Sequence, residues 1–348
     1  MVSITATSSR QGLVELKAAP EERRRPLADF RQKASYAIAQ RVIMGQLRKG
    51  LACHSKGEAE FAAFLRRARA WHDRYDGVLP SLEVDATWSE TPDYVAPAPP
   101  TRADWFAPRD KTPRGTVFYV HGGSFVAERS PRIGQLVGRF AAAAEASVYA
   151  PSYRLAPEHP CPAAVEDIVE AWRWQRTHRP DEPVVALAES AGAAIMMAAF
   201  QVVRDRGEPL PAGIVLLSPW LDLSLQSWSV MAASIAKTSP HTMESLAMFA
   251  HFYLQGRSAI EPIASPLFGN FDGFPPMLIH ASRTDILYDD SLRLADRIRD
   301  AGGDLTLRHW ADETHFWERM NTPKARQSIE LAAGFIRRRL DAGLVASQ

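Results

Sequence analysis

The chain has 348 residues, of which 46% are hydrophobic and 23% charged, and its formal net charge is +1. This composition is that of an ordinary soluble globular protein, and the near-zero charge argues against nucleic acid or an anionic membrane as a partner. Only two cysteines are present, which argues against a disulfide framework and favours a cytoplasmic protein. No apolar run reaches the roughly 18 residues that a membrane-spanning helix needs. Residues 1–20 lack a basic segment followed by an apolar core, so we expect no signal peptide.

Two helices are predicted before the first strand. Apolar or small residues recur at helical spacing over residues 27–49, and Gly50 is a plausible stop. A capping box at residues 55–58 opens a second amphipathic helix, which ends near Gly77. Because both helices precede the strands, we expect residues 1–80 to form a separate helical segment laid over the rest.

Strands and helices alternate along the remainder. Residues 81–90 alternate like a strand, and residues 101–107, within a proline-rich passage, are expected to form a short edge strand. Further strands are predicted at residues 115–120, 147–151, 184–188, 214–218, 277–281 and 305–309. Helices are predicted at residues 133–144, 163–177, 191–206, 291–301 and 324–340. This alternation predicts an α/β fold with a mostly parallel sheet and helices on both faces, interrupted by a helical insertion at about residues 225–262.

The segment from residue 184 to 196 combines a short apolar strand with an alanine-rich helix, and Ser190 lies between them. Ala188 and Gly192 flank this serine two residues away on either side. Small residues are needed there because strand and helix nearly touch at a nucleophile elbow, a sharp turn that presents a strained serine to a cleft. The alternative is an ordinary serine at a helix start.

A second glycine-containing turn lies upstream, where His121 is followed by Gly122, Gly123 and Ser124 directly after a strand. Consecutive glycines let backbone N–H groups approach a ligand without a Cβ in the way. Such groups can bind the oxyanion of a tetrahedral intermediate. A simple tight turn would explain the glycines but neither the histidine nor the position upstream of the elbow.

A serine nucleophile needs a base and an orienting carboxylate, which follow the serine in the order acid, then histidine, in an α/β-hydrolase sheet. Asp285 lies just after the strand at 277–281, and His315 just after the strand at 305–309. The rival acids Asp289 and Asp290 are interpreted as charges at the start of a helix.

Among the other histidines, His280 and His309 fall inside strands. Solvated or packed side chains on helices and surface loops are expected for His54, His72, His178, His241 and His251. No motif indicates a metal site or a phosphate loop, so no cofactor is expected.

Four motifs together carry a family resemblance. They are HGGS at 121–124, SYRLAPEHPCPAA at 152–164, AESAGA at 188–193 and SPWLDL at 218–223. With them the chain resembles the hormone-sensitive-lipase family of α/β-hydrolases over roughly residues 105–340. The resemblance implies a catalytic domain at 81–348, with residues 1–80 and the insertion at 225–262 forming a cap.

The chain departs from the family pattern near the site. Ser124 replaces the last glycine of HGGG, so its amide remains available but its side chain must point away. Ala188 replaces a glycine, and Glu189 replaces the usual aspartate beside the nucleophile. Three charged side chains of the second motif and its following helix are interpreted as a structural network that holds the loop: Arg154, Glu158 and Asp167.

The resemblance implies that Ser190 attacks an ester carbonyl, with His315 as the base and Asp285 orienting it. Amides of Gly123, Ser124 and Ala191 would bind the oxyanion, while Gly122 holds the turn. The acyl pocket is expected from Phe125, Trp228, Met248, Phe249 and Phe252.

The expected substrate is a small-molecule ester with a short or medium acyl chain. A lactone, an amide or an aryl-formamide fits the same chemistry. A non-catalytic receptor on this fold is the rival from another class, and the presence of His315 argues against it because the related plant hormone receptors lack that histidine. The resemblance leaves room for a homodimer paired through the sheet edge.

Overall fold

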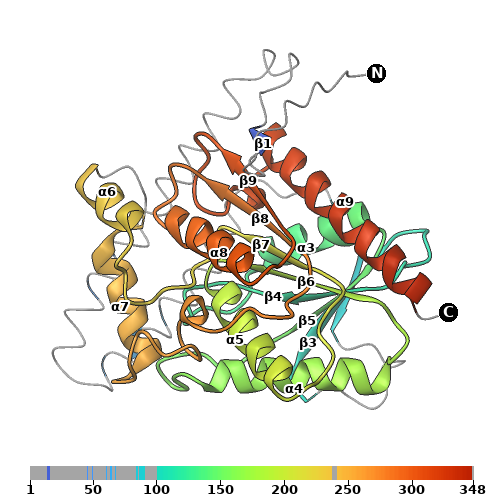
Figure 1. Cartoon of the computed structure of the whole chain (residues 1–348), viewed down its shortest axis with the longest axis horizontal. Coiled ribbons are helices and arrows are strands. Elements are labelled where there is room, and N and C mark those ends of the chain that lie inside the picture. The colour runs from blue at the N-terminus through green and yellow to red at the C-terminus, as the bar shows by residue number, and fades with distance from the viewer. Residues whose placement is uncertain are drawn as a thin grey trace.

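The computed structural model describes residues 14–15, 45, 49, 60, 63–64, 67, 84, 86–90, 100–236 and 241–346. These residues build one nine-stranded sheet of order β1-β9-β8-β7-β6-β4-β5-β3-β2 (Figure 1). Its parallel part consists of β5 (Ser147–Pro151), β4 (Thr116–Val120), β6 (Val184–Glu189), β7 (Ile214–Leu217), β8 (Met277–Ser282), β9 (Leu305–Trp310) and the short β1 (Val14–Glu15).

Two antiparallel strands complete the other edge of this sheet. β3 (Ala103–Pro108) pairs with β5, and β2 (Ala86–Glu90) pairs with β3. The segment at 101–107 was expected to be an edge strand. It forms β3, which is the second strand from the edge because β2 pairs on its outer side. The predicted α/β fold with a mostly parallel sheet is confirmed.

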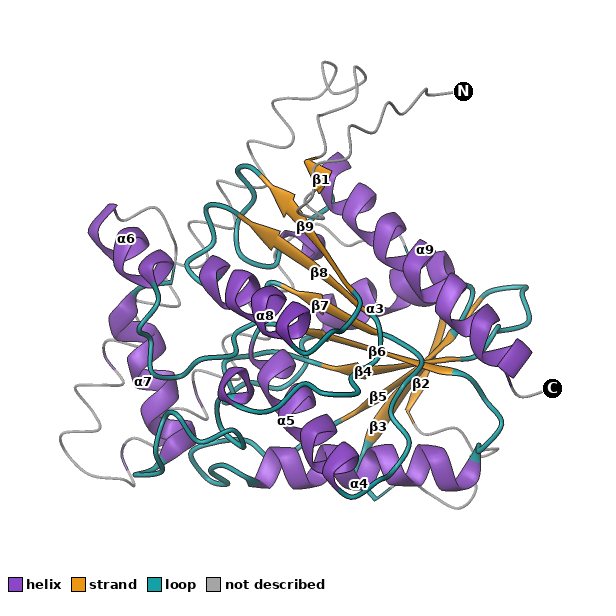
Figure 2. Ribbon diagram, in the orientation of Figure 1, coloured by secondary structure: helices purple, strands orange, loops and turns teal. Residues whose placement is uncertain are grey.

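Helices cover both faces of the sheet (Figure 2). α3 (Pro131–Ala144) and α9 (Pro323–Ala346) cover one face. The other face carries α4 (Ala163–His178), α5 (Ala191–Asp205) and α8 (Tyr288–Asp300). Successive side chains of a strand point to opposite faces, so β4 sends Val117 and Tyr119 into the core beneath α3 and α9, and Phe118 and Val120 into the larger core beneath α4 and α5. Burial on both faces explains why the central strands read as continuous apolar runs.

The insertion forms two cap helices, α6 (Trp228–Ala236) and α7 (Met243–Leu254). Both lie on the side to which the arrowheads of the parallel strands point (Figure 1). α7 begins with a capping box in which Thr242 and Ser245 exchange side-chain and backbone hydrogen bonds. The cap is therefore built over the carboxyl edge of the sheet.

The two helices expected over residues 27–49 and from the capping box at 55–58 to about Gly77 lie outside the described residues, apart from a few positions. With the boundary at residue 80 they stay predictions. Of those positions, Phe64 is buried in the larger core. No helix in the part of the chain that the structure describes is long and apolar enough to cross a membrane.

Candidate active site

Ser190 lies at the turn between β6 and α5. Its backbone angles are φ 51° and ψ −126°, a combination that side-chain-bearing residues rarely adopt. The turn is held because its N–H donates to the carbonyl of Leu217 at 3.0 Å and its carbonyl accepts from the N–H of Trp220 at 3.0 Å. A Cβ at Gly192 would overlap the carbonyl oxygen of His121, so the position two residues after the serine requires glycine. The expected strand–turn–helix is thus present at this serine.

Two loops bring a histidine and a carboxylate to this serine. Nε2 of His315 lies 2.9 Å from Oγ of Ser190, and Nδ1 of His315 lies 2.9 Å from Oδ2 of Asp285. The other carboxylate oxygen of Asp285 accepts the amide of Leu287 at 3.1 Å. Ser190, Asp285 and His315 follow β6, β8 and β9 and are all buried. Carboxyl ends of parallel strands meet at one edge of a sheet, so residues distant in sequence converge there.

Electrostatics favour an ionised pair between acid and base. Burial acts to raise the pKa of Asp285, but the charge and hydrogen bond of His315, with the Leu287 amide and the Ser218 hydroxyl, outweigh it and lower this pKa below its ordinary value. Burial likewise acts to lower the pKa of His315, yet Asp285 outweighs it and leaves this pKa above its ordinary value of 6.5. The aspartate therefore favours the charged form of the histidine.

The turn of residues 121–124 lies beside the serine. The N–H of Gly122 donates to Oε1 of Glu189 at 2.6 Å, and the hydroxyl of Tyr119 donates to the same oxygen at 3.1 Å. A Cβ at Gly122 would overlap the other carboxylate oxygen of Glu189, so this position requires glycine. The amide of Gly122 thus donates to Glu189 and is not available to a ligand, as fits a residue that holds the turn.

Three other amides remain available at this turn and at the start of α5. Among the described residues, the N–H groups of Gly123, Ser124 and Ala191 have no hydrogen-bond acceptor. Gly123 adopts φ 108° and Ser124 φ 53°, both in the region that favours glycine. Ser124 therefore adopts a left-handed backbone conformation that a glycine would adopt with less strain.

Tyr153 supports the turn from behind. Its hydroxyl donates to the carbonyl of His121 at 2.6 Å and lies 3.1 Å from that of Gly122. Its ring stacks on the His121 imidazole with centroids 4.3 Å apart. Burial lowers the pKa of His121 to about 4, so this histidine is neutral and structural.

Phe125 belongs to an aromatic cluster with Tyr253 and Trp220, and the expected residues of α7 share its hydrophobic core. Phe125 stacks on Tyr253 of α7, with centroids 4.1 Å apart, and lies 5.2 Å from the ring of Trp220. The other expected residues on α7 are buried in the same core: Met248, Phe249 and Phe252.

Trp228 differs from these residues. Its side chain is 70% exposed and lies outside the aromatic cluster, because α6 turns Val230 and Ala233 toward the core and leaves Trp228 on the other side. Its place in the acyl pocket therefore stays a prediction, and it is set apart from the buried residues expected there.

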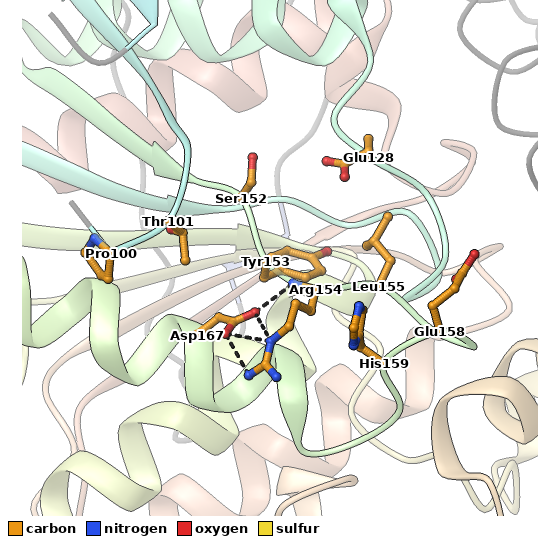
Figure 3. A pocket seen from close by; sticks show the side chains of 10 residues that line it. All are labelled: Pro100, Thr101, Glu128, Ser152, Tyr153, Arg154, Leu155, Glu158, His159 and Asp167. Atoms are coloured by element: carbon orange, nitrogen blue, oxygen red, sulfur yellow. Dashed lines mark hydrogen bonds and ion pairs between the residues drawn. The ribbon is translucent and has the colours of Figure 1, made fainter. Parts of the chain in front are cut away.

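The loop of residues 152–164 is held by an ion pair (Figure 3). Both the amide and the guanidinium of Arg154 donate to Asp167, at 2.7 to 3.0 Å, and the guanidinium also reaches Glu166 at 3.2 Å. Glu158 is exposed at the other side of the pocket in Figure 3 and is not bonded to this pair. This pocket of about 600 Å³ does not include Ser190, Asp285 or His315. The contact between Arg154 and Asp167 thus ties the loop to the start of α4.

The rival histidines are bound elsewhere. Nδ1 of His280 pairs with the hydroxyl of Ser328 at 2.7 Å, and Nδ1 of His309 with that of Tyr288 at 2.8 Å. His54 and His72 lie outside the described residues. Within the described ranges no group of His, Cys, Asp and Glu could hold a metal ion.

Sequence reasoning missed two residues that contact the loops of Asp285 and His315. His241, expected as a solvated or packed histidine, lies against His315 with ring centroids 5.2 Å apart. Ser218 accepts the amide of Phe316 at 3.1 Å and its hydroxyl also bonds Asp285. The SPWLDL motif could have indicated Ser218, whereas His241 has no local signal because the cap brings it there.

Asp290 is more than a charge at the start of α8. It is buried, and its Oδ2 accepts the amides of Leu221 and Asp222 at 2.7 and 3.0 Å. Burial, with the nearby charge of Asp222, raises its pKa to about 7. Asp289 bonds the start of the cap helix α6, where its carboxylate accepts the amide of Ser229 at 2.8 Å.

A strained serine bonded to such a histidine–aspartate pair, at the carboxyl edge of a mostly parallel sheet, defines the class of the protein as an α/β-hydrolase. A family model described as alpha/beta hydrolase fold matches residues 117–319. An acetyl-hydrolase of Streptomyces hygroscopicus is 34% identical over 284 residues, which are 79% of this chain and 94% of that protein.

Solved structures agree with this assignment. An esterase from the bacterial hormone-sensitive lipase family is 30% identical, with a TM-score of 0.72, over 87% of this chain and 98% of that one. The esterase EstE5, whose crystal was soaked with p-nitrophenyl butyrate, is 31% identical, with a TM-score of 0.71, over 80% of this chain and 92% of that one. The chain belongs to the hormone-sensitive-lipase family of α/β-hydrolases.

Proposed function

We propose that the protein is a serine carboxylesterase that hydrolyses short- to medium-chain acyl esters through an acyl-enzyme. The observation that carries the proposal is the hydrogen-bond chain from Ser190 through His315 to Asp285, with 2.9 Å at each step. The relatives named acetyl-hydrolase and esterase support the reaction class.

In this mechanism Oγ of Ser190 attacks the ester carbonyl while Nε2 of His315 takes its proton. His315 then protonates the leaving alkoxide, and the acyl group stays on the serine. Water, deprotonated by the same histidine, attacks the acyl-enzyme and releases the acid. Asp285 keeps the histidine in the required tautomer and stabilises its charged form.

The amides of Gly123, Ser124 and Ala191 bind the oxyanion of both tetrahedral intermediates. The support is that these three donors have no acceptor in the described part of the protein. Losing one such donor typically costs about 2.7–4 kcal/mol of transition-state stabilisation. No cofactor takes part in the reaction.

The acyl group lies against the aromatic cluster of Phe125 and the inner face of α7. Phe249 and Phe252 supply apolar surface from the cap, and a closed cap limits the length of the chain that fits. The butyrate ester soaked into EstE5 supports a short-chain preference. The small number of cysteines supports action in the cytoplasm.

The test is hydrolysis of p-nitrophenyl acetate, butyrate, octanoate and palmitate by wild type and Ser190→Ala. We expect cleavage of the shorter esters by wild type and background rates for the variant. Labelling by a fluorophosphonate reagent, present in wild type and absent in Ser190→Ala, identifies the nucleophile. A wild type that is inert on all four esters and unlabelled would refute the proposal.

A further inference from the structure

Glu189 is a second buried carboxylate at the proposed active site, and the mechanism above does not use it. It is the last residue of β6, directly before Ser190, and only 3% of it is exposed. Its side chain meets the neighbouring strand β4 and the turn after it, where one oxygen accepts both the Gly122 amide and the Tyr119 hydroxyl. The carboxylate therefore joins the nucleophile strand to the turn that carries the proposed oxyanion donors.

The hydrogen bond between Glu189 and Gly122 is short. Oε1 of Glu189 lies 2.6 Å from the Gly122 nitrogen, a distance typical of a charge-assisted hydrogen bond. Gly122 immediately precedes Gly123 and Ser124, so fixing its peptide also fixes where their amides point. The overlap that any Cβ at Gly122 would make with Glu189 shows how closely the two are packed.

Charged and titratable groups surround Glu189 from several elements. Burial acts to raise its pKa above the ordinary value, and the Gly122 amide, the Tyr119 hydroxyl, His315 and Arg319 act to lower it. The effect of burial outweighs these contacts, so the pKa of Glu189 lies above its ordinary value. Glu189 and Arg319 also line a small cavity of about 60 Å³ behind the turn, with His121 and Gly123.

Glu189 directly precedes Ser190, whose Oγ lies 2.9 Å from Nε2 of His315, so its buried carboxylate lies close to the proposed base. His315 is faced by Asp285, Glu189, Arg319 and His241. After the dominant contributions of burial and Asp285, attraction by Glu189 helps to keep the pKa of His315 raised. Ionised Glu189 therefore favours the imidazolium that forms when the serine loses its proton.

We propose that Glu189 is a positioning residue with two effects: it fixes the oxyanion turn through Gly122, and its negative charge supports the protonated form of His315 beside Asp285. This inference rests on the proposed esterase function. It concerns the contacts that this glutamate, in place of the family's aspartate, makes with Gly122 and Tyr119.

The two effects separate in three variants. Glu189→Gln keeps an oxygen acceptor for the Gly122 amide but loses the charge. We expect it to retain most of kcat at pH 8 and to move the acid limb of kcat/KM to lower pH, by up to about 1 pH unit. Glu189→Asp keeps the charge but shortens the reach, so kcat falls with little movement of the limb. Glu189→Ala loses both, and kcat falls by about 10²-fold with a smaller change in KM.

Glu182→Gln is the matched control. Glu182 accepts the Thr116 hydroxyl at 2.7 Å near the opposite ends of the same two strands, far from the turn. Its amide variant should keep both the kcat and the pH profile of wild type. If the acid limb of kcat/KM also moved in Glu182→Gln, the shift in Glu189→Gln would reflect the loss of any carboxylate and the inference would fail.

Titration of His315 by ¹H–¹⁵N NMR gives a readout that does not depend on ester hydrolysis. We expect its midpoint to be lower in Glu189→Gln than in wild type and unchanged in Glu189→Asp. An unshifted His315 in Glu189→Gln, or a wild-type kcat in Glu189→Ala, would overturn the inference. An inert wild type with the expected NMR shift would instead refute the esterase function and leave the electrostatic role of Glu189 standing.

Discussion

The imidazole of His241 stands nearly perpendicular to that of His315, with the ring planes at 84° and the centroids 5.2 Å apart. His241 directly precedes Thr242, the N-cap of α7, so this contact joins the cap to the proposed catalytic base. Burial, followed by the charge of His315, lowers the pKa of His241 to about 3. His241 is therefore neutral at any pH at which the protein would work.

Because His241 is neutral, its effect on the base should come from packing. Aromatic pairs of this geometry contribute about 0.5–1.5 kcal/mol. We expect His241→Ala to lower kcat by about two- to tenfold, as the base loses its packing partner, and His241→Phe to keep most of it. Steady-state rates with p-nitrophenyl butyrate measure both. Equal losses in the two variants would show that the imidazole nitrogens matter, not the ring contact.

The pH dependence should report the raised pKa of His315. The base must be neutral to accept the serine proton, so activity is lost as pH falls through this pKa. We expect the acid limb of kcat/KM to have its midpoint above 6.5 in wild type. In Asp285→Asn the main partner that raises the pKa of His315 is gone, while burial and the weaker effect of Glu189 remain, so the midpoint should fall below 6.5.

The same variant should lose about 10⁴-fold in kcat, because the neutral amide no longer fixes the tautomer. Rates across pH 5–9 measure both effects. A wild-type midpoint below that of Asp285→Asn would contradict the assignment of Asp285 as the acid. Circular dichroism serves as the control that the variant is folded.

Ser218 links the acid to the loop of the base. Its hydroxyl accepts the Phe316 amide at 3.1 Å and bonds Asp285. We expect Ser218→Ala to lower kcat by about tenfold, since a hydrogen bond to a charged group contributes about 1.5–3 kcal/mol and part of that loss is recovered by relaxation.

Ser265→Ala provides a matched comparison for Ser218→Ala. Ser265 is also a buried serine whose hydroxyl accepts a loop amide, that of Leu223 at 2.8 Å, but among the described residues it makes no hydrogen bond to the loops of Asp285 and His315. It should lower the melting temperature and leave kcat unchanged. If Ser218→Ala has the kcat of wild type, Ser218 does not help to position the acid and the base.

Asp290 should make stability depend on pH. Its pKa is about 7 in the folded protein and 3.8 as an ordinary side chain, so the folded state binds this proton more tightly. The stabilisation is complete below pH 3.8 and is lost as pH rises through about 7. Asp290→Asn keeps an acceptor for the Leu221 and Asp222 amides without this loss.

We therefore expect Asp290→Asn to melt at a higher temperature than wild type at pH 8 and to show a smaller difference at pH 5. Thermal unfolding followed by circular dichroism at the two pH values measures this. A variant that is destabilised more at pH 8 than at pH 5 would mean that the ionised carboxylate is the favoured form. Asp289→Asn, on the neighbouring side chain that bonds Ser229, is the control.

The elements that could be predicted from the sequence are those with local signals. β5 has the predicted bounds, Ser147–Pro151, because it is a short apolar strand between a turn and a proline-rich loop. The elbow was predictable because the small residues Ala188 and Gly192 mark a close approach. Asp285 and His315 could be chosen because each lies in a loop directly after a predicted strand, in the order that an α/β-hydrolase sheet requires.

What the sequence could not indicate depends on contacts between distant segments. Helical periodicity does not say which face of α6 meets the core, so the exposure of Trp228 could not be foreseen. His241 meets His315 only through the packing of the cap. The turn of the Glu189 side chain toward Gly122 depends on the pairing of β6 with β4, which no local pattern encodes.

The hydrogen bond between Ser190 and His315 joins residues 125 positions apart in the chain. Closing so long a loop is entropically costly, and contacts of this kind form late and slowly in folding. During synthesis the serine and its elbow leave the ribosome long before the histidine does. Secondary structure should thus return before esterase activity on refolding, and hydrolysis would report the completed domain, not its early intermediates.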